Sequence, residues 1–280
     1  MSNIKIGICG IGFVGNAMKD SFINKGYILN QTLFVYDKYK ENGIGTFEDL
    51  LQTDILFLSL PTIFDYDTLI YDKGPIVETL ASLKNNSYGG VVIIKSTVEP
   101  QTTEKYAIEY QLNLIHNPEF LTARTAYEDF HNQKHIVLGK SSVCTESVVK
   151  LTEEFYKTNY PNATLSLCTS DESETMKIFA NTFYASKVQI FTEFYLLCQK
   201  INVNFNNVKD IMIKNGWINP MHTTIPGPDG KISYGGLCFP KDTTALLHFM
   251  KTNESECSVI EAVIKERENM RDDNHNTTKK

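Results

Sequence analysis

Apolar runs and amphipathic stretches alternate along the first 168 residues of the chain. The runs read IKIGICG, LFVYD, DILFLSLP, GVVIIKST, LNLIHNPEF and HIVLG, and amphipathic segments lie between them. Continuous apolar runs of this length are typical of strands that are buried on both faces of a sheet. Their alternation with helices predicts an α/β fold with a doubly wound, mostly parallel sheet over residues 1–168.

The pattern changes after residue 168 to one long helical period. Apolar positions recur at helical spacing over roughly 171–200, and either Ser170 or Asp171 is the predicted N-cap. We predict a helical domain at 169–264 that is built on this long central helix. The segment 265–280 is so polar that we expect it to be disordered.

Composition sets wide limits. A chain of 280 residues is long enough for two domains, and 42% hydrophobic with 21% charged residues is typical of a globular protein. The net charge of −6 argues against a nucleic-acid surface. We find no signal peptide and no apolar run that could span a membrane, so we expect a cytoplasmic protein with reduced thiols. Its cysteines show no metal-site spacing, and they are Cys9, Cys144, Cys168, Cys198, Cys238 and Cys257.

Three glycines follow the first predicted strand in the spacing G-x-G-x-x-G. They are Gly10, Gly12 and Gly15, and a helical pattern begins directly after them. Such a loop makes a tight turn, lets the backbone approach a pyrophosphate, and directs N–H groups of the helix N-terminus toward its charge. The order of strand, loop and helix therefore predicts a Rossmann-type dinucleotide site.

The second predicted strand ends in Asp37, which lies 22 residues after Gly15. An acid at this place is suited to binding a ribose 2′-hydroxyl, and it would repel the 2′-phosphate of NADP. NAD is therefore favoured as the cofactor. Two alternatives stay open, because Lys38 offers a base to a 2′-phosphate and Asp37 is also compatible with an ordinary turn at a strand end.

Three further strands end in polar residues and prolines. Ligands of doubly wound sheets bind at the carboxyl ends of the strands, so we expect these residues to lie near the site. They are Pro61 and Thr62, Ser96 and Thr97, and Asn117, Pro118 and Glu119.

The segment YGGLCFPKDT at 234–243 places Cys238, Lys241 and Asp242 directly after a glycine pair. Glycines let the backbone approach a ligand closely, and Pro240 fixes the turn that follows. A lysine stabilises a thiolate and an aspartate accepts a proton, as covalent chemistry on a carbonyl requires. A small buried core cysteine is the competing interpretation, and the segment alone does not decide between them.

On the long helix, Glu174, Lys177 and Asn181 fall at helical spacing, and the last two share one face one turn apart. An ammonium group beside an amide is suited to holding an oxyanion. A solvated stripe of polar residues is the alternative interpretation.

Together these segments resemble the UDP-glucose/GDP-mannose dehydrogenase family, whose NAD-dependent members oxidise the C6 alcohol of a nucleotide sugar to a carboxylate in two hydride transfers. The matching segments run in order through both predicted domains. They are the glycine loop, LSLPT at 58–62, KSTV at 95–98, NPEFL at 117–121, ETMKIFANTFYASKVQIFTE at 174–193 and GGLCFPKD at 235–242. The resemblance implies a homodimeric nucleotide-sugar 6-dehydrogenase with UDP-glucose as the favoured substrate.

The resemblance also implies roles for single residues. Cys238 is similar to the nucleophile that attacks the intermediate aldehyde, giving a thiohemiacetal that is oxidised to a thioester and then hydrolysed. Lys177 and Asn181 resemble the pair that stabilises negative oxygen at C6. The remaining catalytic positions are Asp242 and Thr97, which resemble groups that order water and relay protons, and Glu119, which resembles an acid that assists hydrolysis.

The binding residues that the resemblance implies form two sets. The cofactor set is Gly10, Gly12, Phe13, Val14, Gly15, Asp37, Lys38, Pro61, Thr62, Ser96, Thr97 and Lys241. The substrate set is Phe120, Leu121, Lys177, Asn181, Lys231, Tyr234, Gly235 and Gly236. No metal site is implied.

Three features depart from the family pattern. Full-length members carry a further C-terminal Rossmann-like domain that completes the nucleotide-sugar site, and this sequence stops shortly after its helical domain. Ala123 stands where the family often has a second glutamate. In the loop at 219–231, Met221, His222 and Lys231 stand where the family has an arginine that reaches a neighbouring subunit. We take Lys231 as the candidate substitute and His222 as a plain loop histidine.

Two other functions remain possible from the sequence. A hydroxyacid dehydrogenase of related architecture would use the helix lysine and asparagine but perform one oxidation without a thiol, so Cys238→Ser would leave it active. A non-catalytic NAD-binding regulatory subunit is the second. The intact spacing of Lys177, Asn181, Cys238 and Asp242 argues against it.

Overall fold

A computed structural model describes residues 4–122, 124–271 and 273, and these divide into two compact units. The N-terminal unit lies within residues 1–63 and 71–177, and the helical unit lies within residues 64–70 and 178–280. The division within the long helix thus comes later than the predicted boundary after residue 168. The structure also assigns residues 64–70 to the helical unit, which the sequence did not predict.

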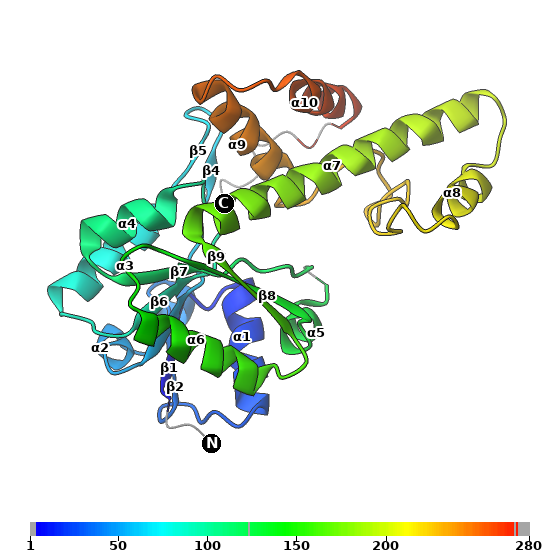
Figure 1. The fold of residues 1–280 in the computed structure, drawn as a ribbon. Helices are drawn as coiled ribbons and strands as arrows, with labels where there is room; N and C mark the ends of the chain where they lie inside the picture. The colour runs from blue at the N-terminus through cyan, green and yellow to red at the C-terminus, as the bar shows by residue number, and fades with distance from the viewer. Residues whose placement is uncertain (1–3, 123, 272, 274–280) are drawn as a thin grey trace. The chain divides into compact units, whose positions relative to one another are not determined.

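The N-terminal unit is built on a seven-stranded sheet in the order β2-β1-β3-β6-β7-β8-β9 (Figure 1). Neighbouring strands pair in parallel except for β7 and β8, which are antiparallel. The predicted doubly wound, mostly parallel sheet is therefore confirmed. The strands are β1 (Ile6–Cys9), β2 (Leu33–Tyr36), β3 (Ile55–Leu58), β6 (Val91–Ile94), β7 (Asn113–His116), β8 (His135–Lys140) and β9 (Thr164–Thr169).

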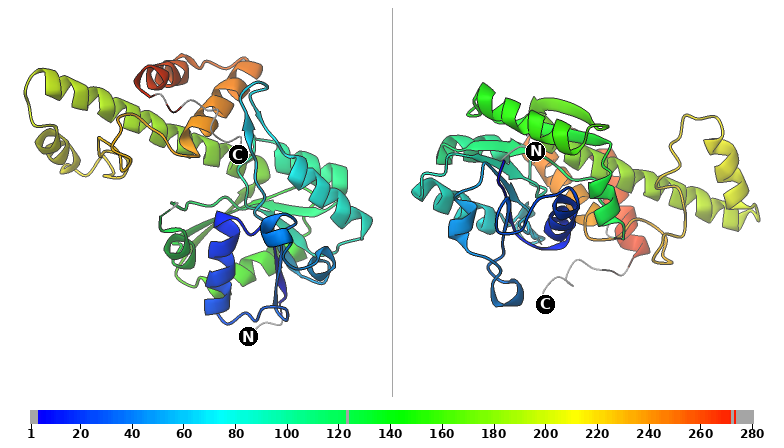
Figure 2. Two further views of the ribbon diagram at one scale, coloured as in Figure 1. Left: turned by 180° about the vertical axis from the view of Figure 1, so that it is seen from behind. Right: turned by 90° about the horizontal axis from the view of Figure 1, so that it is seen from below.

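Both faces of this sheet are apolar, because successive residues of each strand point to opposite sides. Ile55 and Phe57 enter one core cluster, and Leu56 and Leu58 enter the other. Helices α1 (Phe13–Asn24), α5 (Ala126–His131) and α6 (Glu146–Asn159) contribute to the first cluster. Helices α2 (Phe47–Leu50), α3 (Gly74–Asn85) and α4 (Thr102–Tyr110) contribute to the second, so helices cover both faces (Figures 1 and 2).

The long helix α7 (Ser170–Lys200) confirms the predicted element, but its cap differs. The Glu172 N–H donates to Thr169 Oγ1 at 3.3 Å, and the Thr169 N–H donates to Glu172 Oε2 at 2.8 Å. These reciprocal bonds make Thr169 the N-cap of a capping box. The predicted caps Ser170 and Asp171 are wrong by one and two residues, because the preceding strand β9 runs directly into the helix.

The helical unit contains the rest of α7 and three further helices, α8 (Phe205–Ile213), α9 (Phe239–Thr252) and α10 (Ser258–Met270). The short strands β4 (Phe64–Asp65) and β5 (Ile70–Tyr71) pair with each other, and residues 64–70 belong to this unit. None of the helices in the described part of the chain combines the length and apolar character that crossing a membrane requires.

The C-terminal segment differs from the prediction. We expected disorder from residue 265, but α10 continues to Met270, and Arg267 and Arg271 are buried. Arginine counts as polar in a sequence, yet its stem packs and its guanidinium group can be fully hydrogen-bonded inside a protein. For residues 272 and 274–280 the prediction lies outside the described residues.

Candidate active site

Two of the three glycines between β1 and α1 are required by the packing of the loop itself. Gly10 has a φ of +91°, and a Cβ there would lie 2.6 Å from the carbonyl oxygen of Ser59. A Cβ on Gly15 would lie 1.9 Å from the carbonyl oxygen of Gly10. A Cβ on Gly12 would meet no other described atom within 4 Å. Gly10 and Gly15 therefore shape the loop, whereas Gly12 leaves space for a ligand.

Helix α1 presents an open N-terminus to this space. Its N-cap is Gly12, and no described side chain caps it. Phe13 and Val14 begin the helix, and the N–H groups of a first turn have no partner within the helix. These donors and the positive end of the helix dipole suit an anion such as a pyrophosphate.

Asp37 lies at the end of β2 and accepts hydrogen bonds with both carboxylate oxygens. The Ile11 N–H donates to Oδ2 at 2.8 Å, and the N–H groups of Tyr39 and Lys40 donate to Oδ1 at 3.0 Å each. Burial by itself would raise the pKa of Asp37, but these donors stabilise the carboxylate and hold its pKa below the usual value. Asp37 therefore braces the glycine loop as an anion.

A cleft of about 1010 Å³ opens beside the loop and Asp37. Residues 10–14, 37–40 and 59–61 line it, together with Glu78 on α3. The Lys38 ammonium group donates to Glu78 Oε1 at 2.7 Å, so this base is already paired with an acid. Two carboxylates at the cleft disfavour a 2′-phosphate, and the residues present therefore fit NAD better than NADP.

The carboxyl ends of β3 and β6 are tied together by side chains. The Thr62 hydroxyl donates to the carbonyl oxygen of Thr97 at 2.8 Å, and the Ser96 hydroxyl donates to that of Leu60 at 2.6 Å. Pro61, between these contacts, lines the cleft. Of these predicted cofactor residues, Thr62 and Ser96 thus hold the strand ends in place.

Lys177 and Glu119 form an ion pair within the N-terminal unit. Lys177 is 5% exposed, and its ammonium group lies 3.3 Å from Glu119 Oε1 and donates to the Glu119 carbonyl oxygen. It also lies 5.3 Å from the ring centre of Phe120. The Leu121 N–H donates to the other Glu119 oxygen at 2.6 Å. Four of the predicted site residues are therefore neighbours here.

A second buried lysine supports the same turn, and sequence reasoning missed it. Lys95 is 3% exposed and donates to Asn117 Oδ1 at 2.7 Å, and the Tyr156 hydroxyl donates to the same oxygen at 2.5 Å. Burial lowers the pKa of Lys95 to about 7. Burial also lowers the pKa of the adjacent His116 to about 3, which keeps that ring neutral. The KSTV segment contains Lys95, but only its serine and threonine carried a prediction.

Glu174, which precedes Lys177 on α7, binds to the start of another helix. Its carboxylate accepts hydrogen bonds from the N–H groups of Thr102 at 3.2 Å and Thr103 at 2.8 Å, which are the first residues of α4. Burial raises the pKa of Glu174 to about 7, although these donors oppose the shift. Glu174 therefore anchors the start of α7 to the N-terminal unit.

In the helical unit, Cys238 is the N-cap residue of α9, and its side chain is exposed. Pro240 lies in the first turn of the helix, where proline is well tolerated. The competing interpretation of Cys238 as a buried core residue is thus wrong for this structure. A helix N-terminus favours the thiolate form of a cysteine.

Asp242, four residues later, is fully buried and receives two side-chain donors. Asn181 Nδ2 donates to Oδ2 at 2.6 Å, and the Lys241 ammonium group donates to Oδ1 at 2.7 Å. The Asp242 N–H also donates to the Cys238 carbonyl oxygen at 2.9 Å. Asn181, Lys241, Asp242 and Cys238 therefore form one cluster in the helical unit. Lys177 and Asn181 lie one turn apart on α7, on either side of the division between the units.

The loop before Cys238 carries His222 and Lys231. The His222 ring stacks on the Tyr184 ring, with 4.7 Å between the ring centres. It also packs edge-on against the Phe239 ring, with 5.4 Å between the centres. Burial lowers the pKa of His222. The packing supports our interpretation of His222 as a structural loop residue, whereas Lys231 is exposed.

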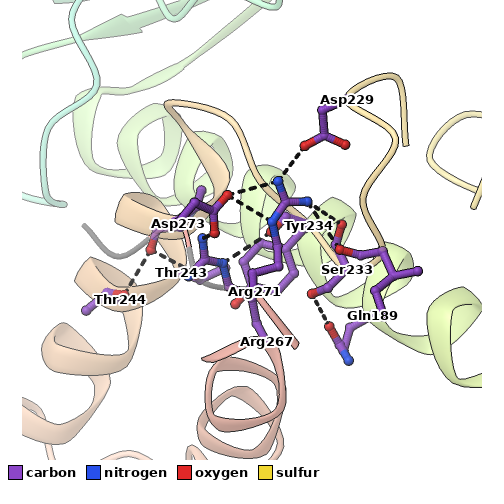
Figure 3. A network of polar contacts seen from close by, with 11 residues as sticks. Gln189, Asp229, Ser233, Tyr234, Thr243, Thr244, Arg267, Arg271 and Asp273 are labelled. Carbon is purple, nitrogen blue, oxygen red and sulfur yellow. Dashed lines mark hydrogen bonds and ion pairs between the residues drawn. The ribbon is translucent and has the colours of Figure 1, made fainter. Parts of the chain in front are cut away.

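The backbone just before Cys238 is held by a polar network that Figure 3 shows. Tyr234 is 2% exposed, and its ring packs with Ala185 and Val263 in a core cluster, so it serves as a core residue here. Gly235 lies against the guanidinium group of Arg271, while Gly236 has a φ of +81° and open space around it. Sequence reasoning missed Arg271. The other departure from the family pattern, Ala123, lies outside the described residues.

Two regions of the chain match the domains of a single family. Residues 39–159 match the NAD binding domain of the UDP-glucose/GDP-mannose dehydrogenase family, and residues 171–269 match its central domain. The first match begins two residues after Asp37 and includes the Glu119 turn. The second covers Lys177, Asn181 and Cys238.

Curated relatives of the chain carry the name UDP-glucose 6-dehydrogenase. The protein from Campylobacter jejuni is 29% identical over 237 residues, which cover 82% of this chain and 56% of the relative. The protein from Rickettsia bellii is 32% identical over 186 residues, which cover 62% of this chain and 40% of the relative. The chain therefore spans about half the length of these curated relatives.

A solved structure shares the fold. It is a UDP-glucose dehydrogenase from the hyperthermophilic archaeon Pyrobaculum islandicum, with a TM-score of 0.81, 22% identity, and coverage of 96% of this chain and 68% of that one. The NAD-binding match also confirms NAD as the cofactor. Because both domain matches run in the family's order over both units, the chain belongs to the UDP-glucose/GDP-mannose dehydrogenase family.

Proposed function

We propose that this protein oxidises the C6 alcohol of a nucleotide sugar to a carboxylate, with UDP-glucose as the favoured substrate. Membership of the family and the name shared by the relatives support a nucleotide-sugar dehydrogenase. The observation that carries the two-step reaction is Cys238, an exposed thiol at the N-terminus of α9. A single oxidation would need no such thiol.

The reaction balances with water as the only other reactant. Two NAD molecules, when bound in turn, would supply the hydride acceptors for the alcohol carbon and for the thiohemiacetal carbon. The Cys238 thiolate adds to the aldehyde carbon, which forms the C–S bond and leaves negative charge on the oxygen. After the second oxidation the product is a thioester, and water cleaves its C–S bond to give the carboxylate and the free thiol. The sum is one alcohol, two NAD⁺ and one water to one carboxylate, two NADH and three protons.

Polar groups of both units are candidates for the remaining steps. Lys177 and Asn181 would stabilise the negative oxygen at C6, because an ammonium group and an amide are strong donors in a buried place. Asp242 is buried and held as an acceptor, and with Thr97 it would order the attacking water. Glu119, held by Lys177, would assist proton transfer during hydrolysis.

We also propose that the protein is a homodimer in which helical units meet through α7. The part of α7 within the helical unit exposes large apolar side chains at helical spacing, and an apolar stripe of this kind is typical of an interface. The stripe comprises Phe179, Phe183, Ile190, Phe194 and Leu197. We also propose a cytoplasmic location, where the cysteines would stay reduced.

The test is the number of NADH molecules formed per sugar. Purified protein is mixed with NAD and a panel of UDP- and GDP-sugars, and NADH is counted against sugar consumed. We expect a ratio of two for the wild type and a ratio of one, with aldehyde released, for Cys238→Ser. Cys257→Ser is the matched control, because Cys257 is the N-cap residue of α10 in the same unit, and it should keep the ratio of two.

Two results would contradict the proposal. A ratio of one in the wild type would favour the single-oxidation hydroxyacid enzyme. No NADH with any sugar would favour a regulatory subunit.

A further inference from the structure

Two buried arginines near the end of α10 hold three consecutive backbone carbonyl groups. Arg271 Nη1 donates to the carbonyl oxygens of Ile232 at 3.2 Å and Ser233 at 3.1 Å, and Arg267 Nε donates to that of Tyr234 at 3.2 Å (Figure 3). Arg267 is 3% exposed and Arg271 is 5% exposed. The two side chains therefore fix the path of the backbone at 232–234.

Two acids complete the network and balance its charge. Asp229 accepts from Arg271 Nη2, while Asp273 accepts from Arg271 Nε at 2.9 Å and from Arg267 Nη2 at 2.8 Å. Each guanidinium group thus has a carboxylate as well as a backbone partner. A buried charge that is paired and hydrogen-bonded in this way is held in one geometry. We call these four residues the arginine clamp.

The clamp gives a physical reason for Gly235. A Cβ on this residue would lie 2.5 Å from Arg271 Nη2 and 2.7 Å from its Cζ. The flat guanidinium group therefore packs directly against the α-carbon, and no larger residue fits there without moving it. The sequence suggested that Gly235 lets the backbone approach a ligand, but the group that approaches it is Arg271.

The same segment is also tied to α7 from the other side. The Ser233 N–H donates to Thr192 Oγ1 at 3.1 Å, and the Ser233 hydroxyl donates to Gln189 Oε1 at 2.5 Å. Gly235, Gly236 and Leu237 then separate the fixed backbone from Cys238. The backbone that leads to the thiol is therefore held by the arginine clamp on one side and by α7 on the other.

We propose that Arg271, assisted by Arg267, is a positioning residue for Cys238. This inference rests on the proposed function, in which the thiol must reach the aldehyde carbon before the aldehyde escapes. A displacement of about 1 Å at a reacting atom is enough to cost roughly a hundredfold in rate. Arg271 touches no reacting atom, and it acts by restricting the backbone that carries the nucleophile.

The direct test is Arg271→Lys, which keeps the positive charge but loses the planar fork that binds two carbonyl groups and two acids. We expect the share of sugar released as aldehyde, trapped with a hydrazide, to rise at least about tenfold relative to acid formed. This ratio does not depend on how much of the protein is folded, so a merely destabilising change leaves it unmoved. The affinity for NAD should stay at the wild-type value. Lys265→Arg, on the exposed side of α10, is the control and should change nothing.

A second readout is independent of activity. Hydrogen–deuterium exchange of the peptide 231–238 should become faster in Arg271→Lys and unchanged in Lys265→Arg. Gly235→Ala provides a second route to the same defect if Arg271→Lys does not fold, and it should raise both the aldehyde share and the exchange rate.

Two outcomes would overturn the proposal. The first is faster exchange with a wild-type share of aldehyde, which would make the clamp merely structural. The second is wild-type exchange in the variants. If the wild type forms no acid from any sugar, the proposed function fails, and exchange alone still shows whether the clamp orders the segment.

Discussion

The glycine loop of the N-terminal unit and the cysteine segment of the helical unit both lead into the N-terminus of a helix, but different groups hold them. The loop leads to the backbone N–H groups of α1, and the cysteine segment places the Cys238 thiol at the start of α9. The loop is shaped by its own glycines, since Gly15 packs on Gly10, and by Asp37 and Ser59 at the ends of the neighbouring strands. The cysteine segment instead depends on Arg271 from a later helix. The residues of both segments can be recognised in the sequence, whereas Arg271, which holds the second segment from far along the chain, cannot.

The largest expected effect comes from a substitution in the glycine loop. Gly15→Ala forces a Cβ into the Gly10 carbonyl group, so we expect a loss of about 1–3 kcal/mol in the free energy of unfolding without NAD. NAD affinity should fall at least about a hundredfold with it, since the loop no longer closes on the pyrophosphate. Thermal unfolding and NAD titration measure the two losses.

Gly12→Ala is the matched control for that loop. Its Cβ meets no described atom within 4 Å, so stability without NAD should change by less than about 1 kcal/mol. NAD affinity should still fall, because the methyl group occupies the ligand's space. Equal effects of the two substitutions on stability would contradict our account of the loop.

The next effect concerns the brace between the loop and β2. Asp37→Asn keeps the shape but removes the charge, so one of its three N–H donors loses its acceptor. We expect NAD affinity to fall about tenfold, which corresponds to about 1.4 kcal/mol. The ratio of NAD affinity to NADP affinity should fall as well. Titrations with both cofactors measure this, and the exposed Asp20→Asn is the control. An unchanged ratio of the two affinities would argue that Asp37 is only a turn residue.

The smallest effect sharpens where α7 is anchored. The pKa of Glu174 is about 7 when folded and 4.5 as the ordinary value, so the native state binds more protons between these pH values. Its contribution to stability is therefore present below pH 4.5 and is lost as pH rises through about 7, by about 1 kcal/mol between pH 6 and pH 7. Glu174→Gln should remove this slope, and Glu48→Gln on the surface should keep it. Denaturant unfolding at a series of pH values measures this dependence of stability on pH. If the dependence persists in Glu174→Gln, Glu174 is not its source.

Much of the fold could be predicted because the signals are local. Buried strands, the glycine loop and α7 each follow from spacing within a short window, and Asp37 follows from its distance to the loop. The cap of α7 was misplaced because no loop separates strand β9 from the helix. Thr169 is therefore both the last residue of β9 and the N-cap of α7. The segment 64–70 was missed because its partners lie far away in the sequence.

The site was predicted in part for the same reason. Family motifs located Lys177, Glu119, Cys238 and Asp242, and also Asn181 and Lys241, which donate to Asp242. They did not locate Lys95 or Arg271, because basic residues are usually exposed and only the fold brings buried acceptors to these two. Tyr234 was interpreted as a substrate contact, although its ring is buried.

The central claim is that the Cys238 sulfur carries the substrate carbon between two oxidations, and one measurement tests it most directly. The protein is mixed with NAD and UDP-glucose, quenched in acid within the first turnovers, digested and analysed by peptide mass. We predict that the peptide containing Cys238 gains the mass of the acyl sugar nucleotide and that hydroxylamine removes it. An unmodified Cys238 peptide at every quench time, while two NADH form per sugar, would contradict the claim.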